Sequence, residues 1–220
     1  MKLKFISVLI IFLLLPYLFF AQNKKRVELG TLHSKNRLQA VNRIISTITQ
    51  RDSAFLHVAE SKGEGIVWLP FKNLKNGSIE IVMRGQDVLQ RSFIGIVFHG
   101  LNDSTYDAVY CRPFNFLAKD SVRRIHAIQY ISHPVFTWKK LREQRNAVFE
   151  KEILNPPDPN EWFTMRIDID NMTIKAFINN SETASLVVEK LTARVIGRLG
   201  VFVGDSSGGD FKRVKIKYRN

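Results

Sequence analysis

Aromatic and polar side chains alternate with apolar ones along the segment that ends at Arg112. Tyr106, Tyr110 and Arg112 would share one face of a strand, while Val109 and Cys111 would share the other. Tyr and Trp rings pack against the C–H surface of a sugar, and Arg, Asn, Gln and His side chains hydrogen-bond its hydroxyl groups. This alternation therefore predicts an accessible sheet face that is suited to carbohydrate.

Further side chains suited to sugar binding follow this strand. Pro113 fixes the chain direction at its end, which leaves the Asn115 amide free to bond a ligand or to close the loop. The structural alternative pairs Arg112 with Asp107 or Glu80. The other side chains of the predicted substrate-binding site are His126, Gln129, Trp138 and Arg142.

Catalysis would need carboxyl groups, because most glycoside hydrolases use two of them, about 5 to 10 Å apart. Glu150 and Glu152 alternate in the required way but fall in a Pro-flanked, loop-like stretch. Glu80, alone on the polar face of its expected strand, is the best single carboxylate, and His99 is a second candidate proton carrier. An isolated glutamate is more often an ion-pair partner than a general acid, so these residues leave catalysis open.

Metal ligands are poorly represented. The five His residues show no ligand spacing, and we expect the single Cys111 to be buried. The oxygen-rich segment from Asp205 to Asp210 would suit Ca²⁺, although a Gly-rich hairpin turn is the preferred explanation. We therefore expect no cofactor, with Ca²⁺ at this turn as the alternative. A serine hydrolase is unsupported, because the chain has no G-x-S-x-G motif.

Short strands must position these groups. The chain has 220 residues, of which 45% are hydrophobic and 24% charged, a balance that excludes disorder as the main state. Period-two alternation between turn residues predicts an all-β, two-sheet antiparallel β-sandwich of the jelly-roll type. The expected strands cover residues 44–48, 54–59, 65–69, 78–85, 92–100, 106–111, 124–132, 162–168, 173–179, 185–189, 199–203 and 211–218. Residues 92–100 are apolar on both faces, which predicts a central strand, and 134–159 read as an excursion off the sheet that carries binding groups.

The first 21 residues differ from the rest. Lys2 and Lys4 precede an apolar run, and Ala21 ends a small-residue cleavage site, which predicts a signal peptide over 1–21 and a single sandwich domain over 22–220. The alternative is a retained membrane anchor. Cleavage would leave no membrane span, and the lone Cys111 excludes an internal disulfide. We expect a secreted or periplasmic protein of a bacterial envelope, and a monomer.

The chain is strongly basic, with a formal net charge of +13. Removal of Lys2 and Lys4 would still leave 31 basic against 20 acidic residues. Nucleic acid, an anionic polysaccharide or the envelope surface would each attract this charge, and a secreted location makes nucleic acid the poorest fit. Basic residues alternate with Val214, Ile216 and Tyr218, which predicts the solvated outer face of an edge strand.

Several stretches resemble secreted bacterial domains of the concanavalin A-like lectin/glucanase superfamily, near the 3-keto-disaccharide hydrolase type. They are FKNLKNGSIEIVMRG, SFIGIVFHG, YDAVYCRPFNF, RRIHAIQYISHPVFTWKKLR, PPDPNEWFTMRIDID and GRLGVFVGDSSGGDFKRVKI. The resemblance implies a two-sheet jelly roll. Gln129 matches such domains, but the chain has His99 where they carry Arg and Ala127 where they carry Glu.

Three functions follow as hypotheses. The resemblance favours a glycan hydrolase or lyase, with Glu80 or a His as proton carrier. The missing Glu near Gln129 favours a noncatalytic, lectin-like glycan-binding module with the same contacts. An envelope protein that recognises another protein across the same face is the third.

Overall fold

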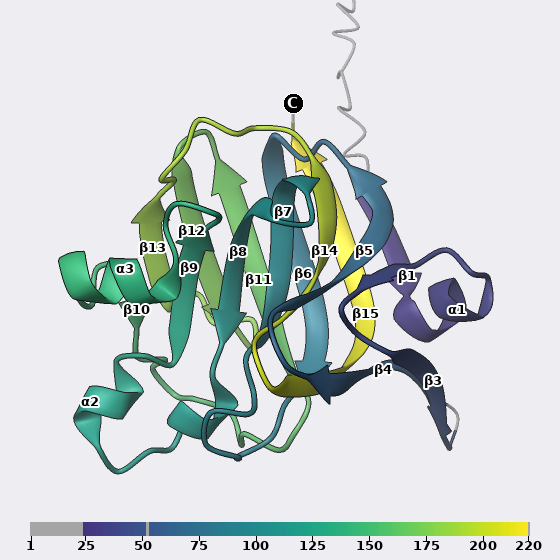
Figure 1. Ribbon diagram of the computed structural model, residues 1–220, viewed down its shortest axis with the longest axis horizontal. Coiled ribbons are helices and arrows are strands. Elements are labelled where there is room, and N and C mark those ends of the chain that lie inside the picture. Colours follow the sequence, from purple (N-terminus) through teal and green to yellow (C-terminus); the bar gives the residue numbers. More distant parts are fainter. Residues whose placement is uncertain (1–23, 52, 220) are drawn as a thin grey trace, which may run out of the picture.

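The computed structural model describes residues 24–51 and 53–219, so the predicted signal peptide lies outside the described residues. The described chain forms two antiparallel sheets stacked face to face (Figure 1). The predicted all-β sandwich is therefore confirmed.

One sheet has eight strands in the order β13-β12-β11-β6-β15-β4-β3, and β1 also pairs with β15. Its strands are β1 (Lys24–Glu28), β3 (Ile45–Gln50), β4 (Ser53–Ser61), β6 (Asn76–Arg84), β11 (Phe163–Asp170), β12 (Thr173–Ile178), β13 (Leu186–Glu189) and β15 (Ser207–Arg219).

The other sheet has seven strands in the order β10-β9-β8-β7-β14-β5-β2. They are β2 (Gln39–Val41), β5 (Gly65–Lys72), β7 (Ile94–Asn102), β8 (Thr105–Cys111), β9 (Ile128–Ser132), β10 (Glu150–Lys151) and β14 (Arg198–Val203). The central position predicted for residues 92–100 is confirmed, because β7 is the fourth strand of the seven.

Alternating apolar residues of both sheets meet in one core. Val214 and Ile216 of β15 are buried against this core, and Val109 and Cys111 approach it from β8. The Sγ of Cys111 lies 3.9 Å from the Sδ of Met165 on β11, which shows that odd-numbered residues of β8 point between the sheets. Each fully buried Val or Ile contributes about 1.5–3 kcal/mol, so this alternation fixes which face each strand turns inward.

Short helices lie outside the sandwich. They are α1 (Leu29–Ser34), the 3₁₀ helix η1 (Pro113–Asn115), α2 (Ser121–Arg124) and α3 (Trp138–Gln144). In Figure 1, α2 and α3 lie on the β9–β10 side and α1 on the β1–β3 side. None of the helices that the structure describes is long and apolar enough to cross a membrane.

Two sequence predictions near these helices need correction. The strand expected from residue 124 begins only at Ile128, because the Asp120 side chain accepts the Val122 N–H and caps α2 instead. The predicted excursion over 134–159 is present but structured: Thr137 caps α3, and Glu150 lies on the edge strand β10.

The prediction of a C-terminal edge strand is wrong. β15 pairs with β6 along one side and with β4 and then β1 along the other. The strand β1 consists of residues 24–28, which are mostly basic. The sequence did not predict this strand, because the stretch has no alternating apolar pattern.

Candidate functional site

A pocket of about 560 Å³ opens on the outer face of the seven-stranded sheet. Tyr110 of β8 points into it, because the neighbouring Cys111 points between the sheets. Six of the eight side chains predicted to contact substrate line this pocket: Tyr110, Arg112, Asn115, His126, Trp138 and Arg142. Residues separated by more than thirty positions thus reach one site.

The floor of the pocket is aromatic. Tyr110 and Phe202 lie on either side of β7, and their ring centroids are 5.1 Å apart. Gly95 is the β7 residue between them, since it is opposite Tyr110 on one side and Phe202 on the other. A Cβ at Gly95 would lie 2.2 Å from the Val109 carbonyl oxygen, so glycine is required for these strands to approach so closely.

Phe93 and Phe114 extend this floor toward the end of β8. Their rings meet edge to face with centroids 5.3 Å apart, and both line the pocket. Phe114 belongs to η1, which starts at Pro113. Proline suits this first helical position because its fixed φ matches the helix and no N–H is lost from the ladder.

Arg112 is held beneath this surface by several acceptors. Its guanidinium donates to the His126 carbonyl at 2.7 Å, to the Tyr110 hydroxyl at 2.8 Å and to Gln129 Oε1. The Tyr110 hydroxyl donates in turn to Gln129 Oε1 at 2.8 Å. Burial raises the pKa of Tyr110 to about 12, which keeps that donor protonated. Arg112 is therefore fixed in position before any ligand arrives.

Glu150 supplies the counter-charge that the sequence did not assign to Arg112. Its carboxylate is buried and lies 3.6 Å from the Arg112 guanidinium. Arg142 of α3 donates to both oxygens, at 3.1 and 2.8 Å, and so attaches the helix to the pocket wall. The partners considered from the sequence, Asp107 and Glu80, are not the ones that Arg112 meets.

Two buried nitrogen atoms beside the pocket have no hydrogen-bond partner among the described residues: Gln129 Nε2 and His126 Nδ1. The latter lies 2.9 Å from Glu150 Oε2, but not in hydrogen-bonding geometry. Burial lowers the pKa of His126, and the Glu150 charge only partly opposes this effect. The neutral imidazole is thus favoured.

Two of the predicted contact residues lie just outside the pocket. Gln129 is buried under Tyr110 and Arg112 and acts by holding them. Tyr106 stacks on His133 with centroids 5.0 Å apart and donates to Glu64 Oε2 at 2.7 Å. Their place is therefore behind the surface that a ligand would touch.

Several other residues line the pocket that the sequence analysis did not assign to the binding site. Glu64 precedes β5 in a turn, Asp205 follows β14, and Phe93 precedes β7. Arg123 of α2 donates to Asn115 Oδ1 at 3.2 Å, so the Asn115 side chain serves partly to attach this helix. Only Asp205 stood out in the sequence, as part of the oxygen-rich turn. The other residues reach the pocket because strands that are distant in the sequence are neighbours in the sheet, which no local sequence pattern reveals.

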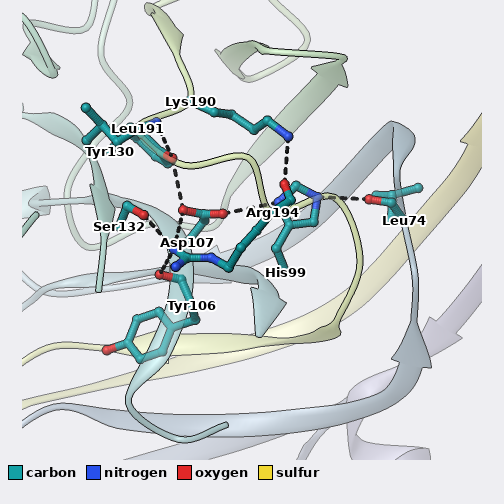
Figure 2. A network of polar contacts seen from close by, with 9 residues as sticks. All are labelled: Leu74, His99, Tyr106, Asp107, Tyr130, Ser132, Lys190, Leu191 and Arg194. Carbon is teal, nitrogen blue, oxygen red and sulfur yellow. Dashed lines mark hydrogen bonds and ion pairs between the residues drawn. The ribbon is translucent and has the colours of Figure 1, made fainter. Parts of the chain in front are cut away.

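The two candidate catalytic residues do not belong to the pocket. Glu80 lies on β6 of the opposite sheet, where Lys215 donates to its carboxylate at 3.2 Å. His99 is fully buried, with Nδ1 3.2 Å from Asp107 and Nε2 3.1 Å from the Leu74 carbonyl (Figure 2). The strand alternation that selected them did not show which sheet, or which side of it, each residue would occupy.

His99 instead belongs to a sealed network around Asp107 (Figure 2). The Asp107 carboxylate accepts hydrogen bonds from Tyr130 at 3.0 Å and from Arg194 at 2.8 Å. Burial alone would raise the pKa of Asp107, but hydrogen bonds from His99 and Ser132 and the Arg194 charge outweigh it and lower that pKa. The network ties the β13–β14 connection to β8 and β9.

The oxygen-rich turn that suggested Ca²⁺ divides between two sites. Asp205 lines the pocket and accepts the Gly63 N–H at 2.5 Å. Asp210 lies on the eight-stranded sheet, where it pairs with Arg84 at 2.7 Å and His57 at 2.8 Å. Within residues 24–51 and 53–219, no group of three or more His, Cys, Asp or Glu side chains is arranged to hold a metal ion.

Comparison with known proteins identifies the fold. No protein-family model and no curated protein sequence matches the chain. Among solved structures, the Bacillus subtilis carbohydrate-binding module CBM66 is 11% identical with a TM-score of 0.54, over 83% of this chain and 92% of that one. A Bacillus subtilis protein with a galectin-like fold is 12% identical with a TM-score of 0.56, over 89% and 96% of the two chains.

A third neighbour is the VIP36 exoplasmic/lumenal domain in a form bound to Ca²⁺ and Man3GlcNAc. It is 8% identical with a TM-score of 0.53, over 89% of each chain. Similarity at this level of identity establishes the fold, and the predicted concanavalin A-like sandwich is confirmed. The narrower 3-keto-disaccharide hydrolase type is not confirmed.

Proposed function

We propose that this protein binds a glycan, without cleaving it, in the pocket on the seven-stranded sheet. The observation that carries the proposal is the pocket floor, where the rings of Tyr110 and Phe202 adjoin the fixed guanidinium of Arg112. Flat aromatic faces beside rigid hydrogen-bond donors match the alternating C–H and hydroxyl surfaces of a sugar. Two structural neighbours, a carbohydrate-binding module and a Man3GlcNAc-bound domain, support the same class of ligand.

The charges around the pocket favour a neutral sugar. Three arginines line it, Arg112, Arg123 and Arg142, and are offset by Glu64 and Asp205 in the lining and by Glu150 behind it. Because the charges nearly cancel, the pocket has no strong preference for an anionic ligand.

Trp138 forms the accessible edge of the pocket. The Trp138 side chain is 44% exposed, and the Arg142 guanidinium lies 5.3 Å from its ring centroid. The same guanidinium donates to Glu150 and so attaches α3 to the pocket wall. An exposed indole held in this way offers a second stacking surface for the next sugar unit of a chain.

Hydrolysis is the second candidate function, because two carboxylates line the pocket. Glu64 is held by the Tyr106 hydroxyl, and Asp205 accepts the Gly63 N–H. A pair of carboxyl groups is the usual equipment of a glycoside hydrolase. The binding proposal is preferred because neither the Glu80 nor the His99 side chain is available to the pocket.

A glycan-array screen of residues 22–220, followed by product analysis of every hit, tests both functions. We expect binding without released sugar, and Trp138→Ala should weaken it about tenfold, since one aromatic contact contributes about 0.5–1.5 kcal/mol beyond its buried area. Met172→Ala, which removes another exposed apolar side chain, is the control. Released sugar that disappears in Glu64→Gln would establish the hydrolase instead, and a folded protein with no glycan hit would overturn the proposal.

A further inference from the structure

A second charged surface lies on the outer face of the eight-stranded sheet, away from the pocket. We call it the basic face. Its side chains alternate with the buried residues Val214 and Ile216 of β15 and with their partners on β1, so all of them point to solvent. The basic face consists of Lys24, Arg26, Arg213, Lys215, Lys217 and Arg219.

Like charges stand directly opposite one another on this face. Lys24 is paired with Lys217, and Arg26 with Lys215, in the register of β1 and β15. Directly opposite side chains on one face have Cβ atoms about 4.5–5.5 Å apart, and two cations at that distance destabilise the sheet. These opposed cations lower the stability of the sheet, so the stability of the fold does not explain their presence.

Carboxylates neutralise only half of the basic face. Lys215 lies 3.2 Å from Glu80, Arg219 lies 3.1 Å from Asp170, and Arg26 lies 3.9 Å from Glu28. The remaining cations have no ion pair within the part of the chain that the structure describes, although Glu28 is opposite Arg213 in the β1–β15 register; they are Lys24, Arg213 and Lys217. Lys217 is flanked by Lys24 on one side and Ser78 on the other, so its neighbours supply no counter-charge.

Protection of a sheet edge would explain Lys24 and Arg26 on β1, which pairs only with β15 among the described strands, but it does not explain the cations of β15. Edge strands use Lys to prevent pairing with other chains, but β15 has a hydrogen-bonded strand on both sides. A row of cations in the interior of a sheet instead resembles one side of an interface whose other side carries the negative charges.

We propose that the basic face binds an acidic polysaccharide, with its carboxylate or sulfate groups lying along β15. Alternate residues of a strand are about 6.8 Å apart, so Arg213 to Arg219 presents a straight row of cations about 20 Å long. Lys24 and Arg26 form a second row beside it on β1. A linear polymer with regularly spaced anions can follow both rows.

The composition of the face favours a polysaccharide over a lipid surface or a nucleic acid. None of β1, β6, β11 and β15 carries an exposed large hydrophobic side chain that would insert into lipid. Tyr218 offers no stacking surface for a base on this face, because it shares the side of β15 that carries Val214 and Ile216 and its ring is half-buried, with Lys25 Nζ 5.7 Å from the centroid. Glu80 lies within the basic face, so a flat anionic membrane would be repelled by its carboxylate. A polymer chain that follows β15 can pass beside Glu80.

The test is binding of the mature chain to immobilised polygalacturonate and dextran sulfate, with neutral dextran as the reference, at about 50 mM and about 200 mM NaCl. We expect both polyanions to bind, dextran not to bind, and affinity to fall steeply with salt. Substitution of Arg213→Gln, Lys215→Gln and Lys217→Gln together should weaken binding about tenfold or more. The matched control removes the same charge from exposed lysines elsewhere, by Lys62→Gln, Lys119→Gln and Lys139→Gln, and should bind almost normally.

Other outcomes would overturn the proposal. These are no binding to either polyanion, equal weakening by both triple variants, or binding only to phosphatidylglycerol vesicles or to single-stranded DNA. Thermal unfolding checks the fold, and Lys217→Gln should not lower Tm, because it relieves repulsion from Lys24. Trp138→Ala should leave polygalacturonate binding unchanged, so failure of the sugar pocket and failure of the basic face are distinguishable.

Discussion

Two polar clusters lie on opposite faces of β8, and only one of them adjoins the pocket. Asp107 points between the sheets, where His99, Tyr130 and Arg194 surround its carboxylate (Figure 2). Arg112 follows the same strand but lies against the open pocket. One strand thus carries a sealed cluster between the sheets and a second cluster beside the pocket.

The difference indicates which buried charges serve the fold and which serve a ligand. In the sealed cluster, both ring nitrogens of His99 face acceptors, the Asp107 carboxylate and the Leu74 carbonyl. Around Arg112, Gln129 and His126 each retain a nitrogen without a partner among the described residues, and both lie beside an open cavity, whereas the buried Arg194 Nε, which also has no partner there, lies away from the cavity.

Breaking the sealed cluster should have the largest effect on stability. Asp107→Asn leaves the largely buried charge of Arg194 without a counter-ion, and we expect a loss of about 3–5 kcal/mol in the free energy of unfolding. Urea unfolding followed by Trp fluorescence measures it. The control Asp168→Asn removes a half-exposed partner of Arg166 and should lose less than about 1 kcal/mol. Equal losses in the two variants would show that the Asp107 cluster does not support the fold.

Replacing the guanidinium at the pocket should have a smaller effect on stability and a greater one on binding. Arg112→Lys keeps the charge but cannot reach the Tyr110 hydroxyl and the His126 carbonyl together. We expect a loss of about 1–3 kcal/mol, because Arg142 still neutralises Glu150, and more than tenfold weaker glycan binding. Calorimetric titration with the glycan and urea unfolding measure the two effects. The control variant is Arg91→Lys, which changes an arginine in an exposed ion pair with Glu60. Unchanged glycan affinity in Arg112→Lys would remove Arg112 from the site.

The smallest predicted effect is a pH dependence of stability that comes from His126 beside the pocket. Burial lowers the pKa of His126, so below about pH 6.5 the unfolded chain binds a proton that the folded chain resists. Stability should therefore fall as the pH drops from about 7.5 to about 5.5, and His126→Gln should show a shallower decline. Identical pH profiles for the two proteins would mean that His126 does not titrate in this way.

The sequence predicted the strands well but not their neighbours. Alternation placed Tyr110 and Arg112 on one face, because side-chain direction depends only on spacing within a strand. It could not place Glu80, since the sheet to which a strand belongs is decided by distant pairing. It also could not show that β1 would cover β15, because five mostly basic residues carry no apolar pattern.

Local exceptions explain the other differences. Glu150 was assigned to a loop because prolines follow it, yet a two-residue pairing with β9 is enough to bury it beside Arg112. His99 lies at φ +50°, a conformation that interrupts the regular register of β7, so its direction could not be obtained by counting alternate residues.

The missing side chain at Gly95 limits how relatives of this protein can diversify. Any larger residue would separate β7 from β8 and part the rings of Tyr110 and Phe202. The floor is therefore the part of the pocket that tolerates the least change. New ligand preferences would have to arise at its rim, where Trp138 on α3 and Leu89 in the loop before β7 are exposed and free to vary.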